Sequence, residues 1–141
     1  AVNLTYYVQA HHFDTQVFLA SIAIGLLAVN VLLVNNYRDV NPDRAAGKHT
    51  TVVLFGTRFG RYFYLVNGLI APVLTLSVWL KPGLLMGLFI PLLFILLHLS
   101  TWRALSRLTG KALNAVLGNT ARNLFIFTLL LGLMLLIYAG R

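Results

Sequence analysis

The chain has 141 residues, of which 59% are hydrophobic and 10% are charged, and its mean hydropathy is +0.82. A soluble domain has about a quarter charged residues, so this composition excludes a water-soluble globular domain and indicates an integral membrane protein. The net charge of +8 comes from cations that flank apolar segments, so we expect membrane lipid, and no nucleic acid, as a partner.

Several apolar runs have about the length of a membrane-spanning helix, which needs about 20 residues. They are residues 17–34, 62–80, 84–102 and 124–138, the last being short unless it begins near Thr120. Residues 1–9 are too short to cross and are interpreted as the end of an earlier helix. We therefore predict an all-α fold, a polytopic transmembrane helical bundle with four to five spans, in which residues 1–141 form a single region.

The connections between the runs predict how the bundle is arranged. Lys81-Pro82-Gly83 is typical of a tight turn, which makes the second and third runs an antiparallel hairpin. Lys and Arg are concentrated in the first and third loops, whereas the second loop contains only Lys81. By the positive-inside rule, the first and third loops should face the cytoplasm.

A few polar residues fall inside the predicted spans. Asn30 and Asn67 are expected to form hydrogen bonds between helices. His98 is expected to be a neutral imidazole bonded to a neighbouring helix, with a functional role as the alternative. Residues 52–63 are interpreted as a segment packed near the membrane surface, with a lid over a site as the alternative.

The hydrophilic stretch 35–48 follows the first run and contains two of the three acidic residues, Asp39 and Asp43. Mg²⁺ prefers hard oxygen ligands and takes one or two carboxylates together with water and phosphate. We therefore expect Asp39 and Asp43 to hold Mg²⁺, with neighbouring amides and cations binding a diphosphate. These neighbours are Asn35, Asn36, Arg38, Arg44 and Lys48. The alternative is a solvated loop in which Asp and Arg pair with each other.

Pro42 affects the local geometry of this stretch. It disfavours helical geometry at Asn41 and suits the first position of a new helix. We predict that one helix ends near Arg38 or Asp39 and that another begins at Pro42.

Three parts of the chain resemble a known family, the UbiA superfamily of intramembrane prenyltransferases. The stretch 35–50 resembles the second aspartate-rich motif of that superfamily, and most of all the branch that acts on 1,4-dihydroxy-2-naphthoate in menaquinone biosynthesis. Residues 5–9 resemble the segment before the helix that carries this motif, and residues 118–124 resemble the stretch leading into the last helices. The specific parts are Asn35-Asn36-x-Arg38-Asp39, Asp43-Arg44 and Gly47-Lys48-x-Thr50.

The resemblance implies a bundle of about nine spans around a laterally open cavity, in an inner (cytoplasmic) membrane. It implies transfer of a polyprenyl group from polyprenyl diphosphate to an aromatic acceptor, 1,4-dihydroxy-2-naphthoate, with 4-hydroxybenzoate or homogentisate as alternatives. Asp39 and Asp43 would be the catalytic metal ligands. Asn36, Arg38 and Lys48 would contact diphosphate.

The family has two facing aspartate-rich motifs, and this chain has one. We therefore expect the chain to resemble the C-terminal half of the enzyme and to need the N-terminal half as a partner. The alternative is a non-catalytic membrane subunit or truncated remnant. Further candidate site residues, expected at a helix start, are Asn119, Thr120 and Arg122.

Overall fold

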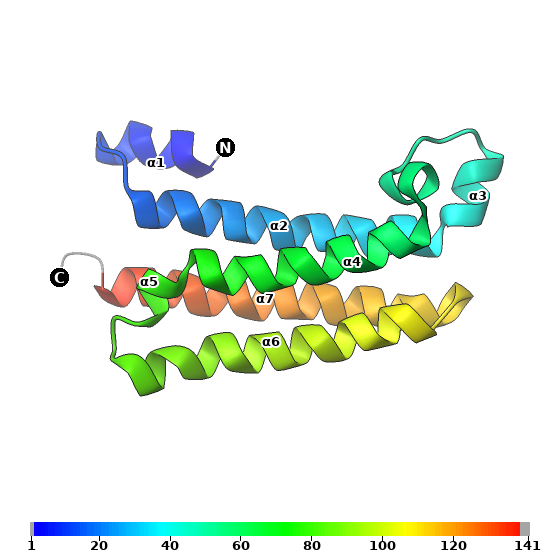
Figure 1. Ribbon diagram of the computed structural model, residues 1–141. Helices are drawn as coiled ribbons and strands as arrows, with labels where there is room; N and C mark the ends of the chain where they lie inside the picture. Colours follow the sequence, from blue (N-terminus) through cyan, green and yellow to red (C-terminus); the bar gives the residue numbers. More distant parts are fainter. Residues whose placement is uncertain (1, 139–141) are drawn as a thin grey trace.

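The computed structural model describes residues 2–138, and every regular element in that range is a helix (Figure 1). The predicted all-α fold is therefore confirmed. The elements are α1 (Val2–Ala10), α2 (Thr15–Arg38), α3 (Val40–Ala45), α4 (Thr51–Leu74), α5 (Leu76–Trp79), α6 (Leu84–Arg107), the 3₁₀ turn η1 (Gly110–Ala112) and α7 (Leu113–Tyr138).

The long helices α2, α4, α6 and α7 run antiparallel to their neighbours and form a four-helix bundle (Figure 1). Helix α2 packs on α4 and α7, and α6 packs on the same two helices from the opposite side. The C-terminal ends of α2 and α6 and the N-terminal ends of α4 and α7 therefore meet at one end of the bundle, which we call the motif end.

Within residues 2–138, three helices rather than four are both long and apolar enough to cross a membrane. They are α2, the segment Gly87–Arg107 of α6, and Gly110–Ile137, which contains α7. Helix α4 is as long as α2, but Arg58 and Arg61 in its first half make it more polar. The second expected run is also divided, because α4 ends at Leu74, two residues after Pro72.

Another boundary also differs from the prediction. Helix α7 begins at Leu113 instead of Leu124. Leu113 and Val116 are buried in the apolar cluster at the motif end, so tertiary packing supports helix where the sequence is too polar to signal a span. Within α4, the helical dihedral angles are interrupted at Gly56, which has φ of 84°. The Lys81-Pro82-Gly83 turn is confirmed, with Gly83 at φ of 112° and its amide donating to Leu80 O.

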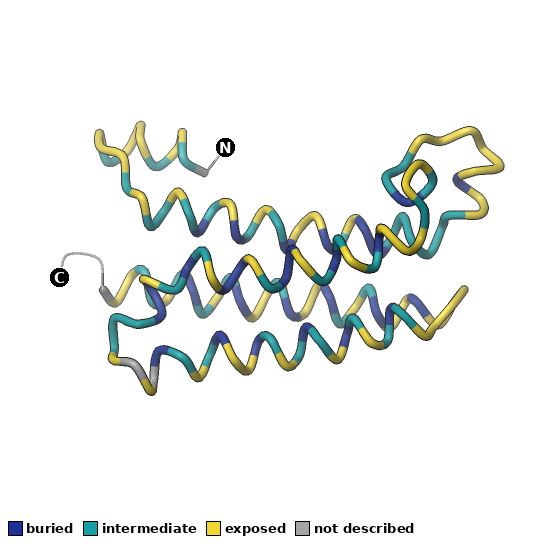
Figure 2. Tube along the Cα trace, in the orientation of Figure 1, coloured by how far each residue is buried: buried dark blue, intermediate teal, exposed yellow. Residues whose placement is uncertain are grey.

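The interior consists of two apolar clusters separated by a layer of buried polar side chains. Figure 2 shows that buried positions recur along the long helices. Trp79, Phe94 and Phe127 belong to the cluster far from the motif end, and Tyr64 and Leu105 belong to the near cluster. The layer between them consists of Asn30, Asn67, His98, Thr101, Thr120 and Asn123.

Hydrogen bonds join the members of this polar layer across all four helices. Asn67 Nδ2 donates to Asn30 Oδ1 (3.1 Å), and Asn30 Nδ2 donates to Tyr64 O (3.0 Å). Asn123 Nδ2 donates to Thr101 Oγ1 (3.2 Å). These bonds confirm the predicted role of Asn30 and Asn67. Because lipid provides no hydrogen-bonding partner, such polar groups have to be satisfied inside the bundle.

His98 is held tightly in this layer. Its Nε2 bonds to Leu65 O at 3.2 Å, as the sequence predicted, and its ring stacks on Tyr64 with centroids 4.7 Å apart. Gly68 on α4 faces the same ring, and a Cβ added there would overlap the imidazole. The close approach of α4 and α6 at this level therefore requires glycine.

We expect Gly68→Ala to destabilise the bundle by about 1–3 kcal/mol, the usual cost of overpacking a well-packed interior. The imidazole of His98 would have to leave its stacked position and its bond to Leu65 O. Thermal unfolding in detergent measures the effect. Gly25→Ala is the matched control, because a Cβ at Gly25 meets nothing within 4 Å. Equal stability of the two variants would contradict this account of the packing.

Candidate functional site

The site lies at the motif end, where the chain leaves α2 and turns into α3. Helix α2 ends at Arg38 with Asp39 as its cap, and the Asp39 amide donates to Asn35 O at 3.0 Å. The predicted helix end is therefore confirmed. Helix α3 begins at Val40, two residues before the predicted start at Pro42. Pro42 lies in its first turn, where a missing N–H breaks no intrahelical bond.

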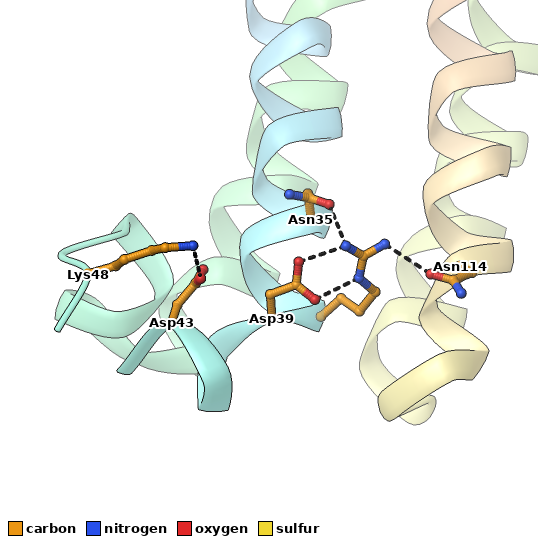
Figure 3. A network of polar contacts seen from close by, with 6 residues as sticks. Asn35, Asp39, Asp43, Lys48 and Asn114 are labelled. Atoms are coloured by element: carbon orange, nitrogen blue, oxygen red, sulfur yellow. Dashed lines mark hydrogen bonds and ion pairs between the residues drawn. The ribbon is translucent and has the colours of Figure 1, made fainter. Parts of the chain in front are cut away.

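Arg38 forms four hydrogen bonds to three other side chains at this end of the bundle (Figure 3). Its Nε and Nη2 donate to the two carboxylate oxygens of Asp39 at 2.8 and 2.6 Å, which is a bidentate ion pair. Nη2 also donates to Asn35 Oδ1 at 2.9 Å, and Nη1 donates to Asn114 Oδ1 of α7 at 3.0 Å. The guanidinium therefore fixes Asp39 relative to α2 and α7.

The second carboxylate is held by the turn that ends α3. Gly47 has φ of 70°, and its amide donates to Arg44 O (3.1 Å), while the Lys48 amide donates to Asp43 O (2.9 Å). These two bonds form a Schellman motif, which favours glycine at this position. The turn places Lys48 Nζ 2.8 Å from Asp43 Oδ1 (Figure 3). Thr50 then caps α4 by accepting from the Val53 amide.

This geometry explains the residue types in Gly47-Lys48-x-Thr50. Glycine allows the left-handed turn, lysine neutralises Asp43, and threonine starts the next helix. The Asp43 side chain is only 9% exposed, whereas that of Lys48 is 63% exposed. The lysine can therefore reach a second anion in solvent, while the carboxylate stays in place.

The pKa values of Asp39 and Lys48 are both shifted by their contacts. The hydrogen bonds from Arg38 are the largest cause of a lowered pKa for Asp39, and the charges of Arg38 and Lys48 add to it. The hydrogen bond to Asp43 is the largest cause of a raised pKa for Lys48. Asp39 is therefore ionised and Lys48 protonated at neutral pH.

Several predicted site residues come together here, and others do not. Asn35, Arg38 and Asp39 form one network, and Asp43 and Lys48 form an adjacent pair. Asn36 is half-buried in the last turns of α2, and Arg44 is exposed on α3. The alternative expectation, that Asp and Arg pair with each other, is met by Arg38 and Asp39, although Asp43 is buried rather than solvated.

Asn119, Thr120 and Arg122 do not lie at a helix start, because α7 begins at Leu113. Thr120 is buried and shares a hydrogen bond of 3.0 Å with the Tyr64 hydroxyl, and Arg122 donates to Asn123 Oδ1 at 3.3 Å. Thr120 is six residues beyond Asn114, which is roughly 9 Å along the helix axis. A direct role of these three residues in the site stays a prediction.

Asn114 is the member of the network that sequence reasoning missed. It precedes the apolar run of α7 by ten residues, and it reaches Arg38 only because α2 and α7 are neighbours in the bundle. Asn114 lies in the first turn of α7, and the sequence pattern did not show that this helix begins at Leu113. A single asparagine there therefore gave no sign of a role in the site.

The donor set fits Mg²⁺. Two carboxylates and nearby amide oxygens are hard ligands, and Mg²⁺ fills its other positions with water and phosphate. Within residues 2–138, no three His, Cys, Asp or Glu side chains gather around one point. The described part of the chain would therefore offer two carboxylates to a metal, without a third such side chain beside them.

We expect Asn114→Ala to loosen the segment 39–50 without unfolding the bundle. Hydrogen exchange of peptides from this segment should become faster, by less than about ten-fold, because one hydrogen bond at a water-exposed site adds little net free energy. Asn119→Ala, on the same helix, is the control and should leave this exchange unchanged. Unchanged exchange in Asn114→Ala would show that Asn114 does not hold Arg38.

The lowered pKa of Asp39 predicts that its contribution to the stability of the folded protein is lost only at low pH. Its contact with Arg38 stabilises the folded state fully above the unfolded pKa of about 3.9, and this contribution is lost as the pH falls through the lower, folded value. Thermal unfolding of the wild type and of Asp39→Asn between pH 2.5 and 6 tests this. The difference in unfolding temperature between the two proteins should be constant above pH 5 and shrink below pH 4. A difference that already begins to shrink near pH 6 would contradict this prediction.

Relatives of known function share part of this sequence. A 1,4-dihydroxy-2-naphthoate octaprenyltransferase of Haemophilus influenzae is 44% identical over 65 residues, or 46% of this chain and 21% of that protein. The protein of the same name from Escherichia coli is 43% identical over 60 residues, 43% of this chain and 20% of that protein. A 2-carboxy-1,4-naphthoquinone phytyltransferase of Synechocystis is 31% identical over 78 residues, 55% of this chain and 22% of that protein.

Each match therefore spans about one fifth of the relative's length. No solved structure is significantly similar to the chain. The sequence profile of the UbiA prenyltransferase family matches residues 1–116. Because this match covers most of the 141 residues, the resemblance is confirmed and the chain belongs to the UbiA prenyltransferase family.

Proposed function

We propose that the protein carrying this chain is a membrane prenyltransferase that moves a polyprenyl group from its diphosphate to an aromatic acceptor. The observation that carries the proposal is the pair of carboxylates at the motif end, each beside its own cation, in a member of this family. Helices long and apolar enough to cross a membrane support its place as an integral membrane protein.

In this proposal Asp39 and Asp43 hold Mg²⁺. When bound, the ion would neutralise the diphosphate as it leaves the allylic carbon. Arg38 keeps Asp39 ionised and oriented through its bidentate pair. Lys48, exposed and protonated, contacts a phosphate oxygen while it remains near Asp43. Arg44, Asn35 and Asn36 are additional diphosphate ligands.

We propose 1,4-dihydroxy-2-naphthoate as the acceptor, in the pathway towards demethylmenaquinone. Two relatives whose names state this substrate match the chain at more than 40% identity, which supports it. We also propose that the motif end faces the cytoplasm of the inner membrane, since the Lys and Arg residues of the first and third loops lie there. The remaining helices of the bundle and the first aspartate-rich motif would come from an N-terminal half.

In the complete protein, Asp39→Asn and Asp43→Asn should each lower Mg²⁺-dependent prenyl transfer by about 10²-fold or more, because each removes a charge needed as the diphosphate leaves. Release of diphosphate by isolated membranes measures this. The matched control is Asp14→Asn, the remaining acid, which caps α2 at the opposite end. Asparagine also caps helices well, so activity should be retained. Full activity in Asp39→Asn would refute the metal role of Asp39.

The acceptor is tested in the same membranes by supplying 1,4-dihydroxy-2-naphthoate, 4-hydroxybenzoate or homogentisate with one polyprenyl diphosphate. Product from the naphthoate alone supports the proposed acceptor. Product from another ring supports prenyl transfer with a different acceptor. No product from any ring, in membranes that contain the folded protein, supports the non-catalytic alternative.

A further inference from the structure

A second group of cations lies at the motif end but outside the aspartate site. Arg58, Arg61 and Tyr62 of α4 and Trp102 and Ser106 of α6 line a hollow of about 230 Å³. A single water needs only about 10–15 Å³, so this hollow has room for a much larger group. The aspartate site is built instead from α2, α3, the α3–α4 turn and the start of α7.

Hydrogen bonds fix the walls of this hollow without using the two guanidinium groups. Trp102 Nε1 donates to Arg61 O at 3.0 Å, and Ser106 Oγ donates to Trp102 O at 2.9 Å. The backbone of α4 is therefore tied to the last turns of α6. The Arg58 and Arg61 side chains remain available for an anion.

The protein itself supplies no such anion in the part described. The chain has eleven Lys and Arg residues but only three acids. Asp39 pairs with Arg38, Asp43 pairs with Lys48, and Asp14 caps α2 at the far end. Within residues 2–138, neither Arg58 nor Arg61 forms a salt bridge. Arg58 is exposed and Arg61 is half-buried, so both guanidinium groups can accept a negative partner from outside the chain.

The surroundings of the hollow are those of a membrane interface. Trp102 and Tyr62 are the residue types found where the bilayer meets water. Beside them on α4, Phe55 and Phe59 are exposed, and their rings are in contact at a tilt with centroids 5.1 Å apart. Phe59 in turn stacks on Phe63 with centroids 5.4 Å apart. An apolar aromatic row next to two arginines matches a ligand with an anionic head and acyl chains.

We propose that this hollow binds the headgroup phosphate of an anionic phospholipid, with Arg58 and Arg61 as its ligands. Basic pockets between membrane helices on the cytoplasmic side commonly hold such headgroups. The site is separate from the diphosphate site, so it stands independently of prenyl transfer. Bound lipid would clamp α4 to α6 beneath the turn that carries Lys48.

Trp102 allows a direct test, because the chain has two tryptophans and the other, Trp79, is fully buried in the apolar cluster away from the motif end. The full chain is placed in phosphatidylcholine vesicles at constant ionic strength. Acyl-brominated phosphatidylglycerol or acyl-brominated phosphatidylcholine is then titrated in. We expect the phosphatidylglycerol to quench Trp102 at a lower mole fraction, and equal quenching by both lipids overturns the proposal.

Substitutions test whether the two arginines cause the preference for phosphatidylglycerol over phosphatidylcholine. Arg58→Gln and Arg61→Gln should each lower the preference for phosphatidylglycerol about 5-fold. The charge-matched control Arg103→Gln with Arg107→Gln removes exposed cations of α6 outside the hollow and should keep the preference. Loss in the control as great as in the hollow variants would indicate general surface charge and overturn the proposal.

Two further experiments distinguish lipid binding from misfolding of the variants and from binding of soluble anions. Arg58→Lys with Arg61→Lys keeps the charge and should retain most of the preference, and its complete loss would overturn the charge-based account. Inorganic phosphate and geranyl diphosphate are added at millimolar concentration to the wild type. Persistence of the lipid quenching supports a lipid site. Its removal by phosphate would indicate a free-anion site, and its removal by geranyl diphosphate alone would indicate part of the substrate site.

Discussion

The need to satisfy the buried polar side chains of an apolar bundle is the constraint on which this structure depends. Lipid offers no hydrogen bonds, so a buried amide, hydroxyl or imidazole has to find its partner on a neighbouring helix. Asn30 and Asn67 bond to each other, Asn123 bonds to Thr101, and His98 bonds to Leu65 O. These contacts link all four long helices at one level and set which faces of the helices meet.

The bundle in turn determines where charge is placed. Cations occur at both ends of the bundle, but most of them lie at the motif end, together with Asp39 and Asp43. Each carboxylate is neutralised by a nearby cation, one through the bidentate grip of Arg38 and one through the Gly47 turn. A negative charge beside a bilayer is costly unless it is paired. The pair with Arg38 also keeps Asp39 ionised, as binding of a metal diphosphate would require.

Two sets of cations at this end have different surroundings. Arg38 and Lys48 are engaged with acids, whereas Arg58 and Arg61 border a hollow between α4 and α6. The first set suits a ligand whose charge is bridged by a metal. The second suits an anion that arrives without one, and its aromatic rim suits lipid. Helix α4 connects the two sets, since it begins at the cap Thr50 and carries both arginines.

Much of this protein followed from the sequence alone. Low charge and long apolar runs determined an all-helical membrane bundle. A chain of this composition cannot cover its surface with polar groups in water, and in lipid its backbone groups are satisfied within helices. The motif could be identified because Asp39, Asp43, Gly47 and Lys48 interact within one short segment. Tertiary structure alone decided the early start of α7, the bond from Arg38 to Asn114, the requirement for glycine at Gly68 and the hollow beside Trp102. Each of these joins residues far apart in the chain, and only the packing of one helix on another determines which distant side chains meet.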